Sequence, residues 1–342
     1  MAQEQRAGHF RANRGPTTAF VLSGGGNQGV SQVGMLRALL ERDIVPDVIV
    51  GTSAGALNGS AIATEPTLAK VDRLEECWVA LTGERVFPGN AIRRAWNILR
   101  RDDHLIRNDG LRDVIRAAGT ARYFADLRIP LRVVAADLLA GEEVVLANGL
   151  LEPALLGSAA LPGIFPPVRH GGRLLADGAI VNLVPISHAL AGPVERIFVL
   201  DVSDPITERP IRSPLDVVIR AFAISRDQRF DLELQHVPED VELVVLPPPE
   251  DDRDFFDFTG GQELIDEAYA LTAATLDDLE ARPGRQRRRR WWQRRLGDWA
   301  ELLQQERRAL RERYERPGQD ADDQRHRSRD EQHHPAPQVD RA

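Results

Sequence analysis

Apolar runs alternate with amphipathic stretches through the N-terminal part of the chain. Residues 17–23 and 47–51 are short apolar runs, which favours strands. Between them, residues 30–42 have helical spacing, with one apolar face formed by Val33, Leu36, Leu39 and Leu40. A helix of small residues is expected directly after Ser53. This order of strand, helix, strand and helix predicts parallel strands joined by right-handed crossovers.

The pattern continues to about residue 280. Residues 66–119 read as a helical insert outside the sheet, with helices over 66–81, 91–101 and 111–118. Further strands are predicted over 131–136, 143–147, 173–176, 196–202 and 241–246, and further helices over 152–160, 185–190, 215–235 and 262–280. The predicted fold class is a three-layer α/β/α arrangement with a mainly parallel central sheet, a helical insert and C-terminal helices. Residues 17–282 are expected to form one folded domain.

Composition changes at both ends of the chain. Residues 1–16 read as a flexible polar leader, and residues 317–342 have few apolar positions and read as disordered. Between 283 and 316 we expect a helix rich in arginine and tryptophan; residues 285–316 hold twelve arginines against five acidic residues, although the whole chain carries a net charge of −8. Two interpretations stay open for this helix: its charged side chains face solvent, or it lies against a membrane surface as a peripheral contact.

The remaining compositional features indicate a cytoplasmic protein. Cys77 is the only cysteine, so no intrachain disulfide can form. No run of apolar residues is long enough for a transmembrane helix, and the N-terminus lacks the apolar core of a signal peptide. No acidic ligand loop stands out, and neither a metal nor a cofactor is expected. The negative net charge gives no reason to expect a nucleic-acid partner.

A G-x-S-x-G motif lies where the second strand ends, formed by Gly51, Ser53 and Gly55. In this motif a serine occupies a strained turn between a strand and a helix, and glycines on either side relieve steric clashes. The hydroxyl then projects at the C-terminal edge of the sheet, close to the N-terminus of the next helix. Ser53 is therefore the candidate nucleophile, although so short a motif also fits an ordinary tight turn.

A glycine loop, from Gly24 to Gly29, follows the first strand and opens a helix. It fits the dinucleotide-binding fingerprint, and it also fits an oxyanion hole of backbone N–H groups. The dinucleotide interpretation needs an acidic residue at the far end of the second strand. Asp47 instead stands at the start of that strand, which favours the oxyanion hole.

A serine nucleophile needs a base. His188 and His236 are the best placed histidines, although each fits a helix surface equally well. The alternative is Asp177, which we expect at the end of a parallel strand, followed by Gly178 and Ala179. A carboxylate there could take the serine proton directly.

Taken together and in this order, three motifs resemble the patatin-like phospholipase family: the glycine loop, the G-x-S-x-G turn and Asp177-Gly178-Ala179. The stretch from Ala160 to Pro167 also resembles the segment that precedes the aspartate of this family. The resemblance implies acyl ester hydrolysis on lipids through an acyl-enzyme. It further implies a Ser53–Asp177 dyad without a catalytic histidine, and an oxyanion hole of the backbone N–H groups of Gly24, Gly25 and Gly26, with Gly29 completing the loop motif.

Three points remain open in the sequence. Gln28 stands where the family often has arginine or lysine, so a cation that would add charge to the oxyanion site or brace the loop is missing. The alternative functions are an α/β-hydrolase with a Ser-Asp-His triad and a non-enzymatic dinucleotide-binding module. Trp78 and Trp96 either pack in the core or line an acyl-chain channel.

Overall fold

The computed structural model describes residues 17–81, 107–203, 214–251, 253 and 257–281. The predicted leader, the helix over 91–101 with Trp96, the arginine-rich helix and the C-terminal tail lie outside the described residues. All described residues fall in one compact unit of the chain.

A sheet of eight strands forms the centre of this unit, in the order β5-β6-β3-β2-β1-β7-β8, with β4 paired to β3. Its parallel part consists of β3 (Leu131–Asp137), β2 (Val48–Thr52), β1 (Thr18–Leu22), β7 (Arg196–Leu200) and β8 (Glu242–Leu246). The side chains of β1 are fully or almost fully buried, as expected of a central parallel strand covered on both faces. The predicted three-layer, mainly parallel fold is confirmed.

Three strands at one end of the sheet run antiparallel to their neighbours. β4 (Glu142–Leu146) returns along β3, and β6 (Arg173–Asp177) also pairs with β3 in the antiparallel sense. The expectation that Asp177 ends a parallel strand was therefore wrong. The reason is a hairpin that the sequence analysis missed: β5 (Val168–His170) turns into β6 through Gly171 and Gly172, with φ of 59° and 80°.

Strands β2 and β6 lie end to end along the same edge of β3. Val133 and Val134 pair with β2 on one side and β4 on the other, while residues 135–137 pair with β6 and β4. Because β4 occupies one edge of β3 over residues 133–137, β2 and β6 must share the other edge. They run in opposite directions, so their C-terminal ends meet. Thr52 is opposite Val134, and Asp177 is opposite Ala135.

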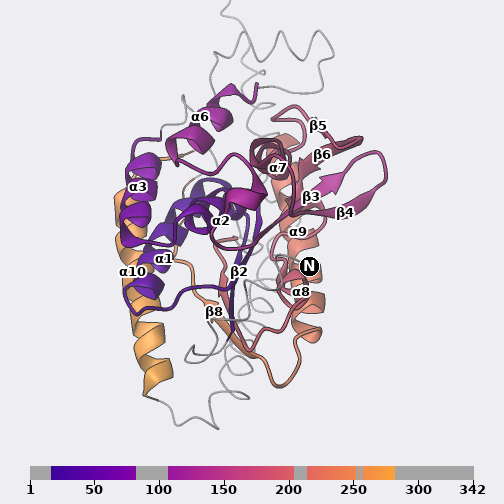
Figure 1. The fold of residues 1–342 in the computed structure, drawn as a ribbon. Helices are drawn as coiled ribbons and strands as arrows, with labels where there is room; N and C mark the ends of the chain where they lie inside the picture. Colours follow the sequence, from indigo (N-terminus) through magenta and orange to yellow (C-terminus); the bar gives the residue numbers. More distant parts are fainter. Residues whose placement is uncertain (1–16, 82–106, 204–213, 252, 254–256, 282–342) are drawn as a thin grey trace, which may run out of the picture. The chain divides into compact units, whose positions relative to one another are not determined.

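Helices cover both faces of the sheet (Figure 1). One layer contains α1 (Ser31–Leu40), α2 (Ala54–Thr64), α3 (Leu68–Val79) and α10 (Gly261–Glu280), which contact one another, and α2 packs on β1, β2 and β3. The other layer contains α8 (Ile186–Ala189) and α9 (Pro214–Gln235). α6 (Asp109–Ala117) and α7 (Leu151–Ser158) contact each other, and α7 packs beside β5 and β6.

Three short 3-10 helices complete the described elements. Two of them, over Gly26–Val30 and Gly178–Ile180, lie in the glycine loop and directly after Asp177. The third covers Phe124–Asp126.

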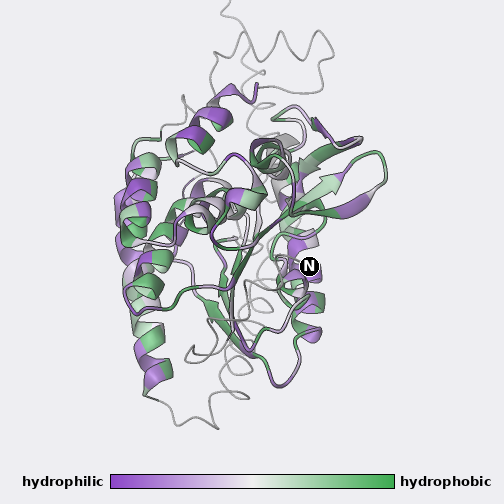
Figure 2. Cartoon of the chain, viewed as in Figure 1, coloured by the Kyte–Doolittle hydropathy of each residue, from purple (hydrophilic) through white to green (hydrophobic). Residues whose placement is uncertain are grey.

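The contact between α1 and α10 depends on Gly34. A Cβ atom on this residue would lie 2.1 Å from the carbonyl oxygen of Ile265, so only glycine allows the two helix backbones to approach so closely. Figure 2 shows green and purple positions alternating along α10, as expected for a helix with one buried face. The packing of α1 and α10 supports the helix that carries the glycine loop at its N-terminus.

Candidate active site

Ser53 occupies the sharp turn between β2 and α2. Its backbone has φ 52° and ψ −124°, a conformation that residues with a side chain rarely adopt. Such strain persists only where the surrounding structure enforces it, and it is common at functional sites. The side chain of Ser53 is half-buried. The structure thus contains the strained turn between strand and helix that G-x-S-x-G predicts.

The two flanking glycines are required by close backbone approaches. A Cβ atom on Gly51 would lie 2.7 Å from the carbonyl oxygen of Gly55. One on Gly55 would lie 2.3 Å from the carbonyl oxygen of Leu22 and 2.5 Å from that of Ser23. Any side chain at Gly55 would therefore push α2 away from β1 and change the position of Ser53.

Asp177 meets Ser53 at the junction of β6 and β2. The Ser53 hydroxyl donates a hydrogen bond of 2.7 Å to Asp177 Oδ2, and the N–H of Ala179 donates one of 2.9 Å to Oδ1. Asp177 is almost completely buried. Burial raises its pKa to about 7, although these two hydrogen bonds oppose the rise. A carboxylate with such a pKa is well suited to exchange a proton near neutral pH.

Gly178 keeps the chain tight directly after the aspartate. A Cβ atom there would lie 2.6 Å from the carbonyl oxygen of Val134 and 2.7 Å from Thr52 Cγ2. The Thr52 hydroxyl donates to the carbonyl oxygen of Asn182 at 2.9 Å, which ties the end of β2 to the segment after Asp177. These contacts fix the separation between the two segments that carry Ser53 and Asp177.

The glycine loop lies beside Ser53. A Cβ atom on Gly24 would approach Ser53 Cβ to 3.1 Å, and one on Gly29 would approach Ala54 Cβ to 2.7 Å. The N–H of Gly24 donates to the carbonyl oxygen of Leu183 at 3.1 Å, so this predicted oxyanion donor is already occupied. Among the described residues, no group accepts a hydrogen bond from the N–H of Gly25, Gly26 or Ala54. Gly26 has φ 59°.

Gln28 braces the loop from outside the site. Its side-chain amide donates to Asp251 Oδ2 at 2.7 Å, and Arg253 donates to the other oxygen of Asp251 at 2.8 Å. Asn27 likewise donates to the carbonyl oxygen of Asp257 at 2.7 Å. The loop is therefore held by the segment between β8 and α10. This contact was not foreseen, because nothing in the local sequence pairs Gln28 with a residue more than two hundred positions away.

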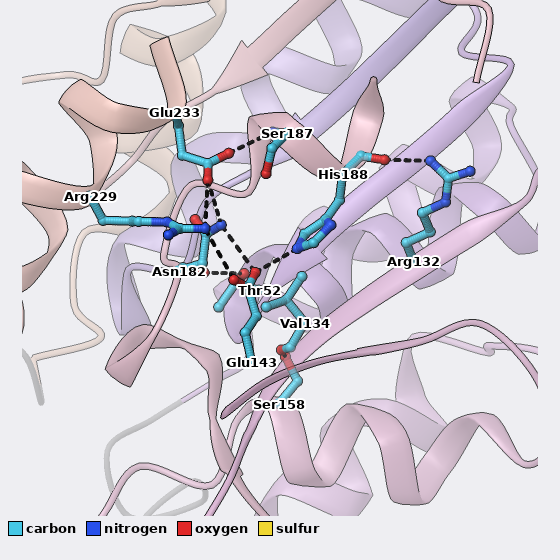
Figure 3. Close-up of polar contacts among 10 residues, drawn as sticks. All are labelled: Thr52, Arg132, Val134, Glu143, Ser158, Asn182, Ser187, His188, Arg229 and Glu233. Atoms are coloured by element: carbon cyan, nitrogen blue, oxygen red, sulfur yellow. Dashed lines mark hydrogen bonds and ion pairs between the residues drawn. The ribbon is translucent and has the colours of Figure 1, made fainter. Parts of the chain in front are cut away.

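Neither candidate histidine contacts Ser53. His188 Nε2 lies 2.5 Å from Glu143 Oε1, and Figure 3 shows the His188 ring directed at this carboxylate. Burial would raise the pKa of Glu143, but the hydrogen bond and charge of His188, with Asn182 and Arg229, hold it below its ordinary value. The ring of His236, directly after α9, forms an exposed hydrogen bond with the carbonyl oxygen of Leu232. The geometry offers no Ser-Asp-His arrangement with either residue.

The residues around His188 form a partly buried polar cluster next to the segment after Asp177. Asn182 is buried and donates to both Glu143 (3.1 Å) and Glu233 (3.0 Å). Arg229 lies between the same two carboxylates, as Figure 3 shows, at 3.2 Å and 3.0 Å. Arg229 thus compensates the charge of the buried Glu233 and of the partly buried Glu143. The cluster anchors the chain that follows Asp177 to α9 and β4.

The C-terminal end of α7 contacts both members of the pair. The Ser158 hydroxyl accepts a hydrogen bond of 2.9 Å from the N–H of Ser53, and the N–H of Asp177 donates one of 2.9 Å to the carbonyl oxygen of Ala160. The sequence analysis noted the stretch from Ala160 onward but assigned it no contact, and Ser158 was missed. The only available signal was a small polar residue at the end of an apolar helix.

An apolar cavity opens beside the pair. It encloses about 550 Å³ of empty space, part of it open to solvent. Ser53, Asp177, Gly26 and Asn27 lie in its wall, and the rest is mainly apolar: Leu57, Trp78, Leu81, Leu111, Val114, Leu161, Phe165 and Phe258. Trp78, for which the sequence left core packing and channel lining open, is buried in the core and also lines this cavity. Its indole N–H donates to Asn58 Oδ1 at 2.8 Å.

Neither a membrane-spanning helix nor a cluster of metal ligands is found in the part of the chain that the structure describes. No helix in this part of the chain is long and apolar enough to cross a bilayer. No group of three or more histidine, cysteine or acidic side chains is arranged to hold a metal ion within the described ranges.

Comparison with known proteins gives related chains. An uncharacterised NTE family protein of Mycobacterium tuberculosis is 34% identical over 183 residues, covering 52% of this chain and 46% of the relative. Patatin-like phospholipase domain-containing protein 7 of Rattus norvegicus is 29% identical over 191 residues, covering 55% of this chain and 14% of the relative. The match thus spans less than half the length of either relative.

Among solved structures, VipD from Legionella pneumophila superposes with a TM-score of 0.43 at 15% identity, over 77% of this chain and 67% of that one. The human GIVD cytosolic phospholipase A2 superposes with a TM-score of 0.39 at 13% identity, over 87% and 59%.

The family model for patatin-like phospholipases matches residues 20–190, half of the chain. The matched range begins in β1 and includes the glycine loop, the Ser53 turn and Asp177. It ends just after α8. The chain therefore belongs to the patatin-like phospholipase family.

Proposed function

We propose that this protein is a serine acyl hydrolase that cleaves acyl ester bonds of lipids with Ser53 as nucleophile and Asp177 as base. The observation that carries the proposal is the 2.7 Å hydrogen bond from the Ser53 hydroxyl to a buried carboxylate at a strained turn. Membership in the patatin-like phospholipase family supports the same chemistry.

The reaction requires one carboxylate to take up a proton and release it again twice, once in each half of the cycle. Asp177 takes the hydroxyl proton as Ser53 Oγ bonds to the ester carbonyl carbon. The tetrahedral intermediate then collapses, and the departing alkoxide takes that proton from Asp177, which leaves an acyl-enzyme. Asp177 next deprotonates a water that attacks the acyl carbon, and the proton returns to Ser53 as the fatty acid leaves. Atoms and charge balance at the end of the cycle.

The negative oxygen of the tetrahedral intermediate needs hydrogen-bond donors. The N–H groups of Gly25 and Gly26 are the best candidates, since both lack a protein acceptor among the described residues, and the N–H of Ala54 at the start of α2 is a third. Gly24 takes a different part, because its N–H is bonded to Leu183. Its missing side chain instead allows the loop to approach Ser53.

The apolar cavity supports an acyl chain as the part of the substrate that is bound. Its walls are aliphatic and aromatic, and its polar groups converge at one point, around Ser53 and Asp177. This is the arrangement expected for a site that holds a hydrocarbon chain and reacts at its carboxyl end. A lipid ester is therefore favoured over a small polar ester. A peripheral membrane contact through residues 285–316 is a further proposal, and it concerns residues that the structure does not describe.

The proposed function is tested with a panel of p-nitrophenyl esters from acetate to palmitate, together with phospholipid and lysophospholipid. Wild type should hydrolyse the longer esters with higher kcat/KM than acetate, because the apolar walls bind the chain. Ser53→Ala should reduce hydrolysis of every substrate to the rate of the uncatalysed reaction, and it should not react with a fluorophosphonate probe that labels wild type. Hydrolysis by Ser53→Ala at the wild-type rate would refute the proposal.

The pH profile provides a separate check on the base. Asp177 must be ionised to accept the serine proton, and burial raises its pKa to about 7. We therefore expect kcat/KM to fall about tenfold per pH unit below neutral, with an apparent pKa near 7 for the free enzyme. A profile that stays flat down to pH 5 would mean that a carboxylate with an ordinary pKa, or another group, acts as the base.

A further inference from the structure

We infer that Ser158 is a positioning residue that holds the strained turn of Ser53 in register with Asp177. The inference rests on the proposed function, since it concerns the same reaction. Ser158 lies at the last position of α7 and is fully buried. It lies outside the glycine loop, the G-x-S-x-G turn and the Asp177-Gly178-Ala179 motif.

The hydroxyl of Ser158 uses both of its hydrogen-bonding capacities on backbone groups of the site. It donates to the carbonyl oxygen of Val134 at 2.6 Å and accepts from the N–H of Ser53 at 2.9 Å. Figure 3 shows Ser158 beside Val134 in β3. The nucleophile's own peptide is thus fixed to the neighbouring strand through one side chain. A conformation with φ 52° at a serine needs such an outside restraint, because it is unfavourable on its own.

The same short segment also holds the base. Two residues after Ser158, the carbonyl oxygen of Ala160 accepts the hydrogen bond from the N–H of Asp177 at 2.9 Å. Ala159, between them, lines the apolar cavity. The segment 158–160 therefore contacts the backbone of both reacting residues and the space for the substrate. Its geometry sets the distance over which the proton must pass.

Loss of the Ser158 hydroxyl has a specific consequence. The N–H of Ser53 and the carbonyl of Val134 would both remain buried without their partner, which is costly. The turn can relieve this cost by rotating the Ser53 peptide, and the 2.7 Å contact with Asp177 would then lengthen. Substrate binding in the cavity depends on other side chains and should change little.

The test compares Ser158→Ala with Ser158→Thr, which keeps the hydroxyl. For Ser158→Ala we expect kcat to fall 10- to 100-fold, as a misplacement of reacting groups by about 1 Å can cause, with KM within twofold of wild type. The threonine variant should recover most of the lost kcat. A matched control is Thr275→Val, which removes a buried hydroxyl bonded to the Leu271 carbonyl in α10 and should leave kcat unchanged.

A second measurement does not need turnover. Amide hydrogen exchange at Ser53, resolved by fragmentation of the peptide over 48–57, should be faster in Ser158→Ala than in wild type or Thr275→Val. The inference is overturned if Ser158→Ala keeps kcat within twofold of wild type, or if exchange at Ser53 does not change. If Ser53→Ala hydrolyses esters like wild type, the proposed function fails instead, and the exchange result still decides whether Ser158 holds the turn.

Discussion

Replacing Asp177 with asparagine should reduce kcat for ester hydrolysis on the order of 10⁴-fold, the scale on which loss of a catalytic carboxylate is felt in serine hydrolases. Asparagine can keep both hydrogen bonds of Asp177, by accepting from Ala179 and donating to Ser53. It cannot take up the proton of the hydroxyl, however. Initial rates with p-nitrophenyl esters, over wild type and Asp177→Asn at equal concentration, measure the effect.

The same substitution should make the folded protein more stable at alkaline pH. The pKa of Asp177 is raised to about 7 in the folded state, against roughly 3.9 unfolded, so its ionisation opposes folding as pH rises between these values. This loss of folding free energy in the wild type is negligible below about pH 3, roughly 1.5 kcal/mol at pH 5 and roughly 4 kcal/mol at pH 8. Asparagine carries no such penalty. The midpoint temperature of thermal unfolding should therefore be several degrees higher for Asp177→Asn than for wild type at pH 8. The difference should be smaller at pH 5.

Two histidine variants serve as controls for the activity loss. His188→Gln and His236→Ala should each retain kcat within about threefold of wild type, because neither ring contacts Ser53. Activity that survives in Asp177→Asn but disappears in His188→Gln would instead favour a histidine base. That outcome would require a rearrangement of the contact between His188 and Glu143.

Replacing Gly55 with alanine should destabilise the protein by about 3 kcal/mol or more and abolish ester hydrolysis. The new Cβ would lie 2.3 Å from the Leu22 carbonyl and 2.5 Å from the Ser23 carbonyl. Both are backbone atoms at the end of the central strand, so they cannot rotate away as a flexible side chain could. Overpacking against a rigid neighbour commonly costs 1–3 kcal/mol, and a clash with backbone exceeds that range. Urea unfolding of both proteins measures the difference.

Gly192→Ala is the matched control for this substitution. No heavy atom lies within 4 Å of a Cβ built on Gly192. Its unfolding free energy should stay within about 0.5 kcal/mol of wild type, with full activity. If Gly55→Ala were as stable as Gly192→Ala, α2 would have to be free to move away from β1, and the described packing of the turn would be incorrect.

Much of the fold follows from local sequence. The strands and helices of the parallel part were predicted to within a few residues, because buried parallel strands and amphipathic helices have distinct periodicities. The β5–β6 hairpin was missed, since β5 is three residues long and its residues alternate only weakly. The direction of β6 was wrong because strand direction depends on the partner, and pairing between residues about forty positions apart leaves no local mark.

The candidate site was also predicted only in part from the sequence. Gly51, Ser53 and Gly55 stand within one five-residue motif, so the sequence predicts the turn directly, although the backbone atoms that require Gly55 belong to Leu22 and Ser23. Ser158 and Asp251 act through hydrogen bonds to distant segments, and the local sequence around a serine or an aspartate does not show such partners. Gln28 is an example. The motif shows that the usual arginine or lysine is absent, and only the fold shows that the Gln28 side-chain amide donates to Asp251.

The meeting of β2 and β6 along one edge of β3 has a consequence for variation within this architecture. Val134 and Ala135, which face Thr52 and Asp177, are consecutive residues. One peptide unit of a buried strand therefore acts as the spacer between nucleophile and base. Loops and helices far from that unit can lengthen, shorten or be exchanged without altering the spacing, whereas an inserted or deleted residue within β3 would separate the two groups at once.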